Sequence, residues 1–126
     1  MNVPDNLRYS SDHEWVLVDG DTAKVGITDY AQDALGDVVF VDLPATGSAI
    51  GAADSFGEVE STKSVSELYA PVSGEIAAVN DALVDTPEKL NEDPYGEGWI
   101  VTISISDPTE LDGLLDADGY RALIEG

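Results

Sequence analysis

The sequence predicts a single, mainly β domain, and three observations support this fold class. Short strand-like runs separated by turn residues fill the first hundred positions, a pattern typical of a sandwich or a barrel. After residue 106 the pattern changes to two short helical segments. The chain has 126 residues and no linker-like tract rich in proline, serine or glycine, so residues 1–126 are expected to form one domain.

Each expected element has a local reason. Thr28 can cap a helix that extends to residue 35 and ends at Gly36. The run Asp-Pro-Thr-Glu at 107–110 gives an N-cap, a first-turn proline and a capping acid, and so predicts a helix. A second helix is expected around 120–124, and this pair should pack on one end of the β core. Runs rich in β-branched and aromatic residues predict strands at 14–18, 22–27, 37–42, 53–60, 64–69, 75–79 and 98–106.

The charge balance restricts the possible partners. Asp and Glu number 26 against five Lys and Arg, which gives a formal net charge of −21. Such a surface repels nucleic acid and anionic membranes, so neither is an expected partner. The N-terminus lacks the basic start and apolar stretch of a secretory signal, and no run is long enough to span a bilayer, so we expect a cytoplasmic protein. Concentrated salt would screen the self-repulsion, which predicts a host with a very salty cytoplasm.

The residue inventory excludes several kinds of chemistry. The absence of cysteine excludes disulfides, thiolate metal sites and a cysteine nucleophile. A single histidine, His13, excludes a multi-histidine metal site and disfavours a Ser-His-Asp triad. The window 81–92 begins with Asp and ends with Glu but lacks the glycine of a calcium loop, so no metal site is expected. If the protein takes part in redox or group-transfer chemistry, an attached group must supply the reactive atoms.

Lysine is scarce, and one of the three lysines has an unusual setting. Lys24 is expected to face outward from a strand, and Lys89 to pair with Glu88 or Glu92. Lys63 has small polar neighbours and lies between two strand-forming runs, which predicts an exposed amine at the tip of a hairpin. Such an amine is suited to acylation, but composition alone favours an ordinary solvated turn lysine.

Residues 58–74, EVESTKSVSELYAPVSG, strongly resemble the lipoyl-attachment segment of glycine cleavage system H proteins. His-Glu-Trp at 13–15 and the run 25–37 look like the N-terminal half of that family, and LNEDPYGEGW at 90–99 looks like its C-terminal signature. Biotin carriers typically place the lysine between two methionines, and acyltransferase lipoyl domains usually have Asp before it, so both match less well. Thr62 stands where many H proteins have Val, a conservative departure in shape.

The resemblance implies a lipoyl/biotinyl-type hybrid of two antiparallel sheets with short flanking helices, including a C-terminal helical segment. It also implies a monomeric carrier rather than an enzyme, with lipoate joined to Lys63 through an amide. In the family's cycle a pyridoxal-phosphate glycine decarboxylase loads an aminomethyl group, which a tetrahydrofolate-dependent aminomethyltransferase removes. Dihydrolipoamide dehydrogenase, with FAD and NAD, then reoxidises the dithiol. A lipoate-attaching enzyme completes the expected partners.

The resemblance further implies a cleft that shelters the arm near the His-Glu-Trp motif. Glu14 would accept the cationic amine there, with His13 and Ser11 nearby. The alternatives are a solvated Glu14 and a structural pairing of His13 with Trp15. Three glutamates beside the arm are expected either to guide partner enzymes to the hairpin tip or to form a plain solvated face: Glu58, Glu60 and Glu67.

Two alternative functions stay open on the sequence. The first is a related lipoyl carrier that serves lipoate relay or another pathway, because the motif reports attachment rather than partner. The second is an unmodified interaction module that keeps the fold and Lys63 without the cofactor.

Overall fold

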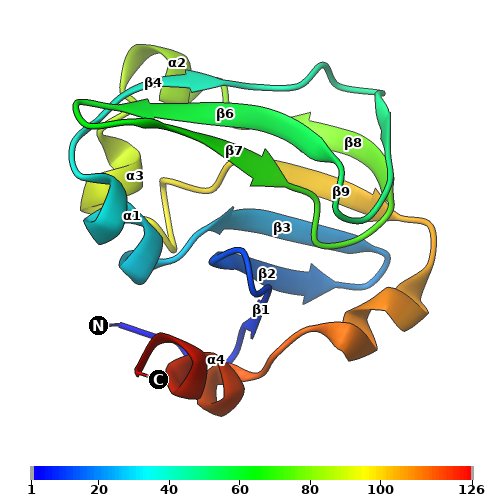
Figure 1. The fold of residues 1–126 in the computed structure, drawn as a ribbon. Coiled ribbons are helices and arrows are strands. Elements are labelled where there is room, and N and C mark those ends of the chain that lie inside the picture. The colour runs from blue at the N-terminus through cyan, green and yellow to red at the C-terminus, as the bar shows by residue number, and fades with distance from the viewer. Residues whose placement is uncertain (1, 126) are drawn as a thin grey trace.

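Two antiparallel β-sheets face each other across the core in the computed structural model, which describes residues 2–125 (Figure 1). The larger sheet has six strands in the order β1-β2-β3-β9-β8-β5, and the smaller has three in the order β4-β6-β7. This arrangement confirms the predicted mainly β class. The strands are β1 (Arg8–Tyr9), β2 (Glu14–Asp19), β3 (Thr22–Ile27), β4 (Val38–Asp42), β5 (Ala49–Ile50), β6 (Ser55–Ser61), β7 (Val65–Tyr69), β8 (Gly74–Val79) and β9 (Val101–Ile105).

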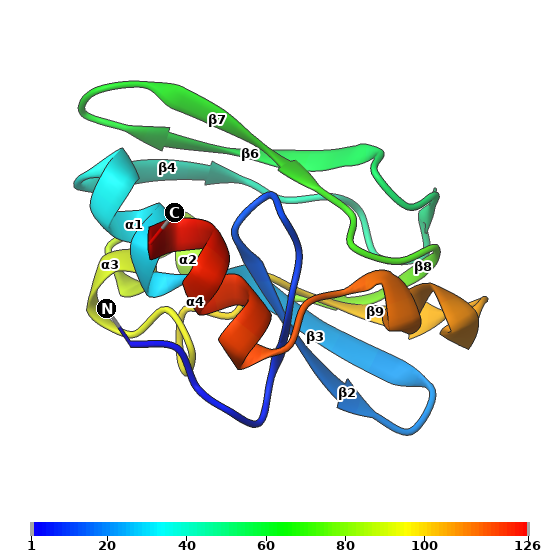
Figure 2. The ribbon, with the colours of Figure 1, turned by 60° about the horizontal axis from the view of Figure 1, so that its bottom comes forward.

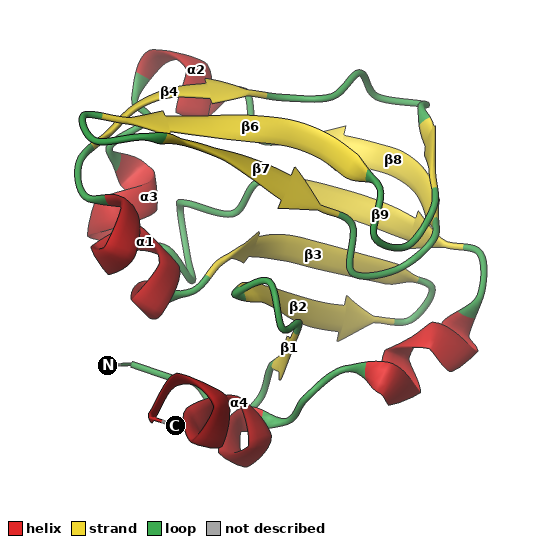
Figure 3. Cartoon of the chain, viewed as in Figure 1, coloured by secondary structure: helices red, strands yellow, loops and turns green. Residues whose placement is uncertain are grey.

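Short helices flank the sheets (Figure 3). Three of them gather at the end of the molecule that carries the β6–β7 turn, whereas the C-terminal helix lies beside β1 (Figures 1 and 2). The helices are α1 (Asp29–Leu35), α2 (Ala82–Asp85), α3 (Lys89–Glu92), the 3-10 helix η1 (Pro108–Gly113) and α4 (Ala117–Glu125).

The predicted helix ends are confirmed for α1. The Thr28 side chain accepts a hydrogen bond from Ala31 N, and Gly36 follows the helix with φ of 81°, a conformation that favours glycine. Asp107 caps η1, as predicted, by accepting from Thr109 N. The predicted role of the acid at 110 is wrong, because Glu110 instead accepts from Ser73 N and Ser73 Oγ at 2.8 and 2.9 Å. It thereby ties η1 to the β7–β8 turn.

All seven predicted strands are present, but two of them, β6 and β9, begin two or three residues later than expected. Ala53 has φ of 72°, which interrupts the extended chain before β6. Residues 96–99 form a turn before β9, in which Trp99 N donates to Gly96 O. The sequence did not predict β1, β5, α2 or α3, since elements of two to four residues are too short to show a periodic pattern.

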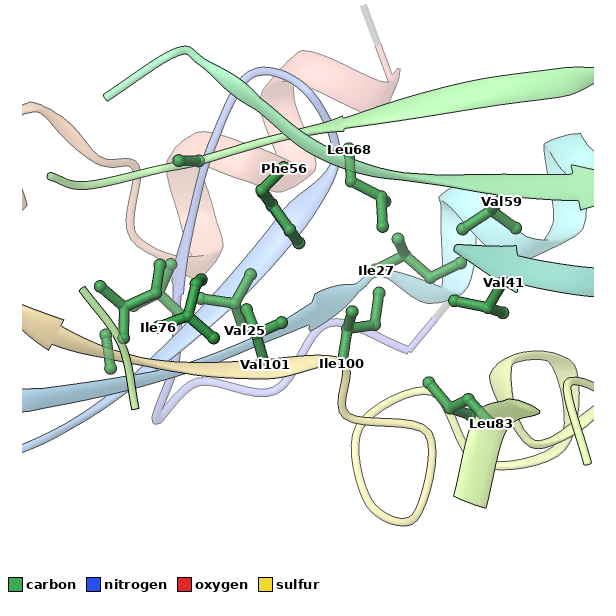
Figure 4. Packing of buried hydrophobic residues seen from close by; sticks show 14 of the residues in the cluster. Val25, Ile27, Val41, Phe56, Val59, Leu68, Ile76, Leu83, Ile100 and Val101 are labelled. Carbon is green, nitrogen blue, oxygen red and sulfur yellow. The ribbon is translucent and has the colours of Figure 1, made fainter. Parts of the chain in front are cut away.

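The main core lies between the two sheets (Figure 4). Val59 and Leu68 of the smaller sheet point toward Ile27 of the larger one, and all three are buried. A second cluster holds α4 to β1 and β2, with the Tyr9 and Tyr120 rings stacked 4.7 Å apart between their centroids. The C-terminal helix therefore packs at the β1 edge of the larger sheet and reaches the β2 side of the molecule, where the candidate site begins.

Candidate functional site

Lys63 lies at the tip of the β6–β7 hairpin, as predicted. The turn is closed by a hydrogen bond from Ser61 N to Ser64 O of 2.8 Å, and Ser61 Oγ accepts from the backbone N atoms of Lys63 and Ser64. Thr62 N donates to Asp37 O, which ties the tip to the chain between α1 and β4. The turn is thus held by its own backbone and by a neighbouring segment while the lysine stays exposed.

The stem of Lys63 passes beside Gly36. A Cβ atom at position 36 would lie 3.1 Å from Lys63 Cε, so a larger residue there would crowd the lysine. Asn91 of α3 fixes this part of the chain, since its Oδ1 accepts from Val38 N and its Nδ2 donates to Gly36 O, both at 2.8 Å. Nothing near residue 91 in the sequence predicts this role of Asn91, because its partners are more than fifty positions away.

Lys63 is also the one basic side chain that residues 2–125 leave without an ion-pair, hydrogen-bond or cation–π partner. Lys89 pairs with the predicted Glu92, whose carboxylate lies 3.9 Å from Nζ, but its nearer partner is Glu97 at 2.9 Å, which was not predicted. The other basic residues pair as follows: Lys24 over the Trp99 ring, Arg8 with Leu111 O, and Arg121 with Asp5 and Asp118.

A cleft of about 270 Å³ runs along the free edge of β7. The backbone N of Tyr69 donates a hydrogen bond to Glu14, on the cleft side of β7, rather than to β6. Because backbone groups alternate in direction along a strand, the N–H and C=O groups of Val65 and Glu67 face the cleft, as Tyr69 N does. The cleft begins next to Lys63 and ends at Glu14, and its lining includes Asp12, His13, Glu14, Tyr30, Leu35 and residues 64–68.

Glu14 is buried at the inner end of this cleft, with 2% of its surface exposed, so it is not a solvated carboxylate. Its Oε2 accepts from Tyr69 N at 3.0 Å, and its Oε1 accepts from Ser10 Oγ at 3.4 Å. Burial, with a smaller effect from the nearby Asp12 charge, raises the pKa of Glu14 to about 8, while the two hydrogen bonds act in the opposite direction. A large share of this carboxyl is therefore protonated near neutral pH.

His13 lines the same cleft in a left-handed backbone conformation, with φ of 67°. Its Nδ1 lies 2.8 Å from the Tyr120 hydroxyl, which in turn lies 2.7 Å from Thr28 Oγ1. Its ring packs on Tyr30 rather than on Trp15, whose Nε1 donates to Pro94 O. Burial lowers the pKa of His13, with Asp12 acting weakly in the opposite direction, so the imidazole is mostly neutral near pH 7.

The structure does not bring Ser11 to the predicted site. Ser11 is exposed and lines a separate hollow with Ala53 and Pro71, whereas Ser10 contacts Glu14. The reason is local: Ser10 N donates to Glu14 O at the end of β1, which turns residue 10 inward and residue 11 outward.

The three predicted glutamates lie on the outer face of the smaller sheet. Glu58 of β6 is directly opposite Glu67 of β7, and Glu60 is opposite Val65. The Tyr69 hydroxyl donates to Glu67 at 3.0 Å, and this bond raises the pKa of Tyr69. The three glutamates therefore form part of one surface beside the hairpin tip.

Residues 2–125 contain no group of three or more His, Asp or Glu side chains placed to hold a metal ion. Within the same range, every helix is too short or too polar to cross a membrane.

A hybrid of two antiparallel sheets that presents an unpaired lysine on a hairpin tip defines a carrier domain of the lipoyl/biotinyl type. The family described as glycine cleavage H-protein matches residues 7–126. The chain therefore belongs to this family, whose members are lipoate-bearing carrier components.

Proteins of similar sequence and structure match this chain over almost its full length. The "Probable glycine cleavage system H protein" of Haloarcula marismortui is 60% identical, covering 99% of this chain and 98% of its own. The H protein of Anaeromyxobacter sp. (strain K) is 54% identical with the same coverage. The crystal structure of a glycine cleavage system H protein from Mycobacterium marinum superposes with a TM-score of 0.90 at 44% identity, covering 98% of this chain and all of that one.

Proposed function

We propose that this protein carries lipoate on Lys63 and works as the mobile carrier of the glycine cleavage system. The observation that carries the proposal is the isolated amine of Lys63. It is exposed, it has no partner among residues 2–125, and it stands on a turn fixed by Ser61 and beside a glycine that leaves room for its stem. Acylation of this amine therefore breaks no ion pair among residues 2–125.

When attached, lipoate supplies a disulfide that can accept an aminomethyl group together with two electrons, and a dithiol that can afterwards give those electrons up. The partners proposed here are glycine decarboxylase with pyridoxal phosphate, aminomethyltransferase with tetrahydrofolate, and dihydrolipoamide dehydrogenase with FAD and NAD. A lipoate-attaching enzyme acts before them. We propose that the protein is a monomer in the cytoplasm. A monomer leaves the hairpin tip accessible to each enzyme in turn.

The cleft beside β7 is proposed to shelter the loaded arm. An extended lipoyl-lysine reaches on the order of 14 Å, and the five residues of β7 span roughly 17 Å. Glu14 at the inner end would bind a cationic amine by giving up its proton, and the neutral His13 nearby would not repel that amine. Ser10 takes the place that the sequence suggested for Ser11.

Modification of Lys63 is tested by mass spectrometry of protein purified from its own host. Trypsin does not cleave after an acylated lysine, so modification predicts one peptide, 25–89, that carries the mass of a lipoyl amide. The Lys63→Arg variant is the control and should yield fragments ending at residue 63. If the native protein gives only unmodified peptides 25–63 and 64–89, the lipoyl-carrier proposal is wrong and the unmodified interaction module takes its place.

The role of Glu14 is tested by the lifetime of the loaded carrier. In Glu14→Gln the amide cannot balance a cationic amine, so loss of the aminomethyl group to water should become several times faster. Glu75→Gln, which changes an exposed glutamate on β8, serves as the control. An unchanged lifetime in Glu14→Gln removes Glu14 from the mechanism. Co-purification with glycine decarboxylase separates glycine cleavage from a role in lipoate relay.

A further inference from the structure

The outer face of the three-stranded sheet carries a row of side chains next to the hairpin tip. Phe40 of β4, Glu60 of β6 and Val65 of β7 are direct cross-strand neighbours. They point outward, because the residues that follow or precede them on β4 and β6, Val41 and Val59, are buried in the core. A bulge in β4 also leaves Val39 on the exposed side.

This row is unusually apolar for an exposed surface. Val39, Phe40 and Val65 are 54%, 47% and 58% exposed, and they are three of the six large hydrophobic side chains that residues 2–125 expose. Isolated exposed apolar residues are ordinary, but several gathered at one place mark an interaction site. The other phenylalanine, Phe56, is buried in the core, so aromatic character at this surface is not a general feature of the chain.

A second row, one step farther from the tip, consists only of carboxylates. Asp42 is directly opposite Glu58, which is directly opposite Glu67. Like charges that face each other across strands destabilise a sheet, and no lysine or arginine within residues 2–125 pairs with these three. A partner surface with basic residues would offset this repulsion.

We propose that these two rows form the docking face for the enzyme that attaches lipoate to Lys63. Phe40 and Val65 would enter an apolar depression of that enzyme, and its lysine or arginine side chains would face the carboxylate row. The inference rests on the proposed lipoylation of Lys63 and adds the surface that selects this lysine for it. This docking face consists of Val39, Phe40, Asp42, Glu58, Glu60, Val65 and Glu67.

The length of the lysine explains why the attaching enzyme, rather than a later partner, is the occupant. The unmodified amine lies only about 6 Å from its own Cα, so an active site that acylates it must come against the hairpin tip and its flanks. Enzymes that act at the far end of the finished arm can work from on the order of 14 Å away. The surfaces that flank the hairpin tip therefore matter most before modification.

The test uses the purified unmodified chain, lipoate, ATP and the lipoate-attaching enzyme of the host. ATP converts the lipoate carboxyl to an acyl-adenylate with release of pyrophosphate. Nζ of Lys63 then forms the amide, loses a proton and displaces AMP. The mass increase of the protein gives the rate, and the series is repeated at several KCl concentrations.

Val65→Ser is compared with Val84→Ser, because Val84 on α2 is 57% exposed and lies outside the docking face. We expect Phe40→Ser and Val65→Ser to lower kcat/KM about tenfold, mainly through KM, while Val84→Ser stays within about twofold of wild type. Glu58→Gln should lower the rate at low salt and weaken its dependence on KCl. Thermal melting of each variant confirms that it is folded.

Three results would overturn parts of this reasoning, and they can be told apart. Equal rates for Val65→Ser, Phe40→Ser and Val84→Ser would show that the docking face is not used by the attaching enzyme. After long incubation, the rate at which dihydrolipoamide dehydrogenase and NADH reduce the lipoylated Phe40→Ser variant is also measured, because Phe40 does not line the cleft that is proposed to shelter the arm. If that rate falls by the same factor as acylation, the face serves partners in general and the assigned occupant is wrong. A wild-type chain that is never acylated contradicts the proposed function itself.

Discussion

Replacing Glu14 by Gln should make the protein more stable, by an amount that grows with pH. The ordinary carboxyl pKa is 4.5, and burial raises that of Glu14 to about 8 in the folded state. Below pH 4.5 both states hold the proton and no stability is lost. Between pH 4.5 and 8 the unfolded chain is ionised while the folded chain keeps its proton, so stability falls by about 1.4 kcal/mol per pH unit.

Above pH 8 the loss is complete and amounts to roughly 5 kcal/mol. Glutamine has nearly the same shape, can accept the hydrogen bond from Tyr69 N, and does not ionise. Its folded state therefore escapes the loss, and the stability difference between Glu14→Gln and wild type should rise from about 1 kcal/mol at pH 5 to several kcal/mol at pH 9.

The assay is urea unfolding of both proteins at half-unit pH steps from 5 to 9 and constant KCl concentration. Urea is chosen because guanidinium would change the ionic strength. Glu75→Gln removes one exposed negative charge and controls for reduced self-repulsion in a chain of net charge −21. A difference between Glu14→Gln and wild type that is flat with pH, or equal to the Glu75→Gln difference, would show that the burial argument is wrong.

Two further predictions concern the fold as a whole. The melting temperature should rise from low to molar KCl, because salt screens the repulsion among 26 acidic side chains, and a flat or falling series would remove the halophilic interpretation. Gly26→Ala should cost about 3 kcal/mol or more, since its Cβ would lie 2.6 Å from the Trp15 ring, whereas Gly113→Ala meets nothing within 4 Å and should change stability by less than about 0.5 kcal/mol. Equal unfolding midpoints of these two variants in urea would contradict the contact.

Local patterns in the sequence predicted the parts of the structure that depend on near neighbours. Thr28 and Gly36 bound α1 because a cap needs only residues within one turn. The hairpin under Lys63 follows from two strand-forming runs and the three residues between them. The lipoyl-type fold and the role of Lys63, by contrast, came from the resemblance to a family, since strand-forming runs alone were compatible with several β architectures.

Features that depend on distant contacts could not be predicted. The burial of Glu14 depends on Tyr69, which is 55 positions away, and nothing around residue 14 indicates a raised pKa. The exposed side of Phe40 depends on a bulge in β4, because the apolar run at 38–41 has no alternation from which its inner face could be read. The exchange of Ser11 for Ser10 at the site depends on where β1 ends.

The same burial that destabilises an ionised Glu14 gives the cleft a way to distinguish two states of the proposed arm. A neutral arm offers nothing to a carboxylate, so Glu14 keeps its proton and adds no negative charge to the inner end of the cleft. A cationic amine next to Glu14 favours the ionised form, because an opposite charge lowers a carboxyl pKa, and part of the free energy lost by burial is then recovered in the ion pair. The recovered part depends on the exclusion of water by β7 and α1. The cleft would therefore bind the aminomethyl-loaded arm in preference to the neutral arm, through its charge. Because His13 is neutral, the cleft holds no imidazolium that would repel the cationic amine and reduce this preference.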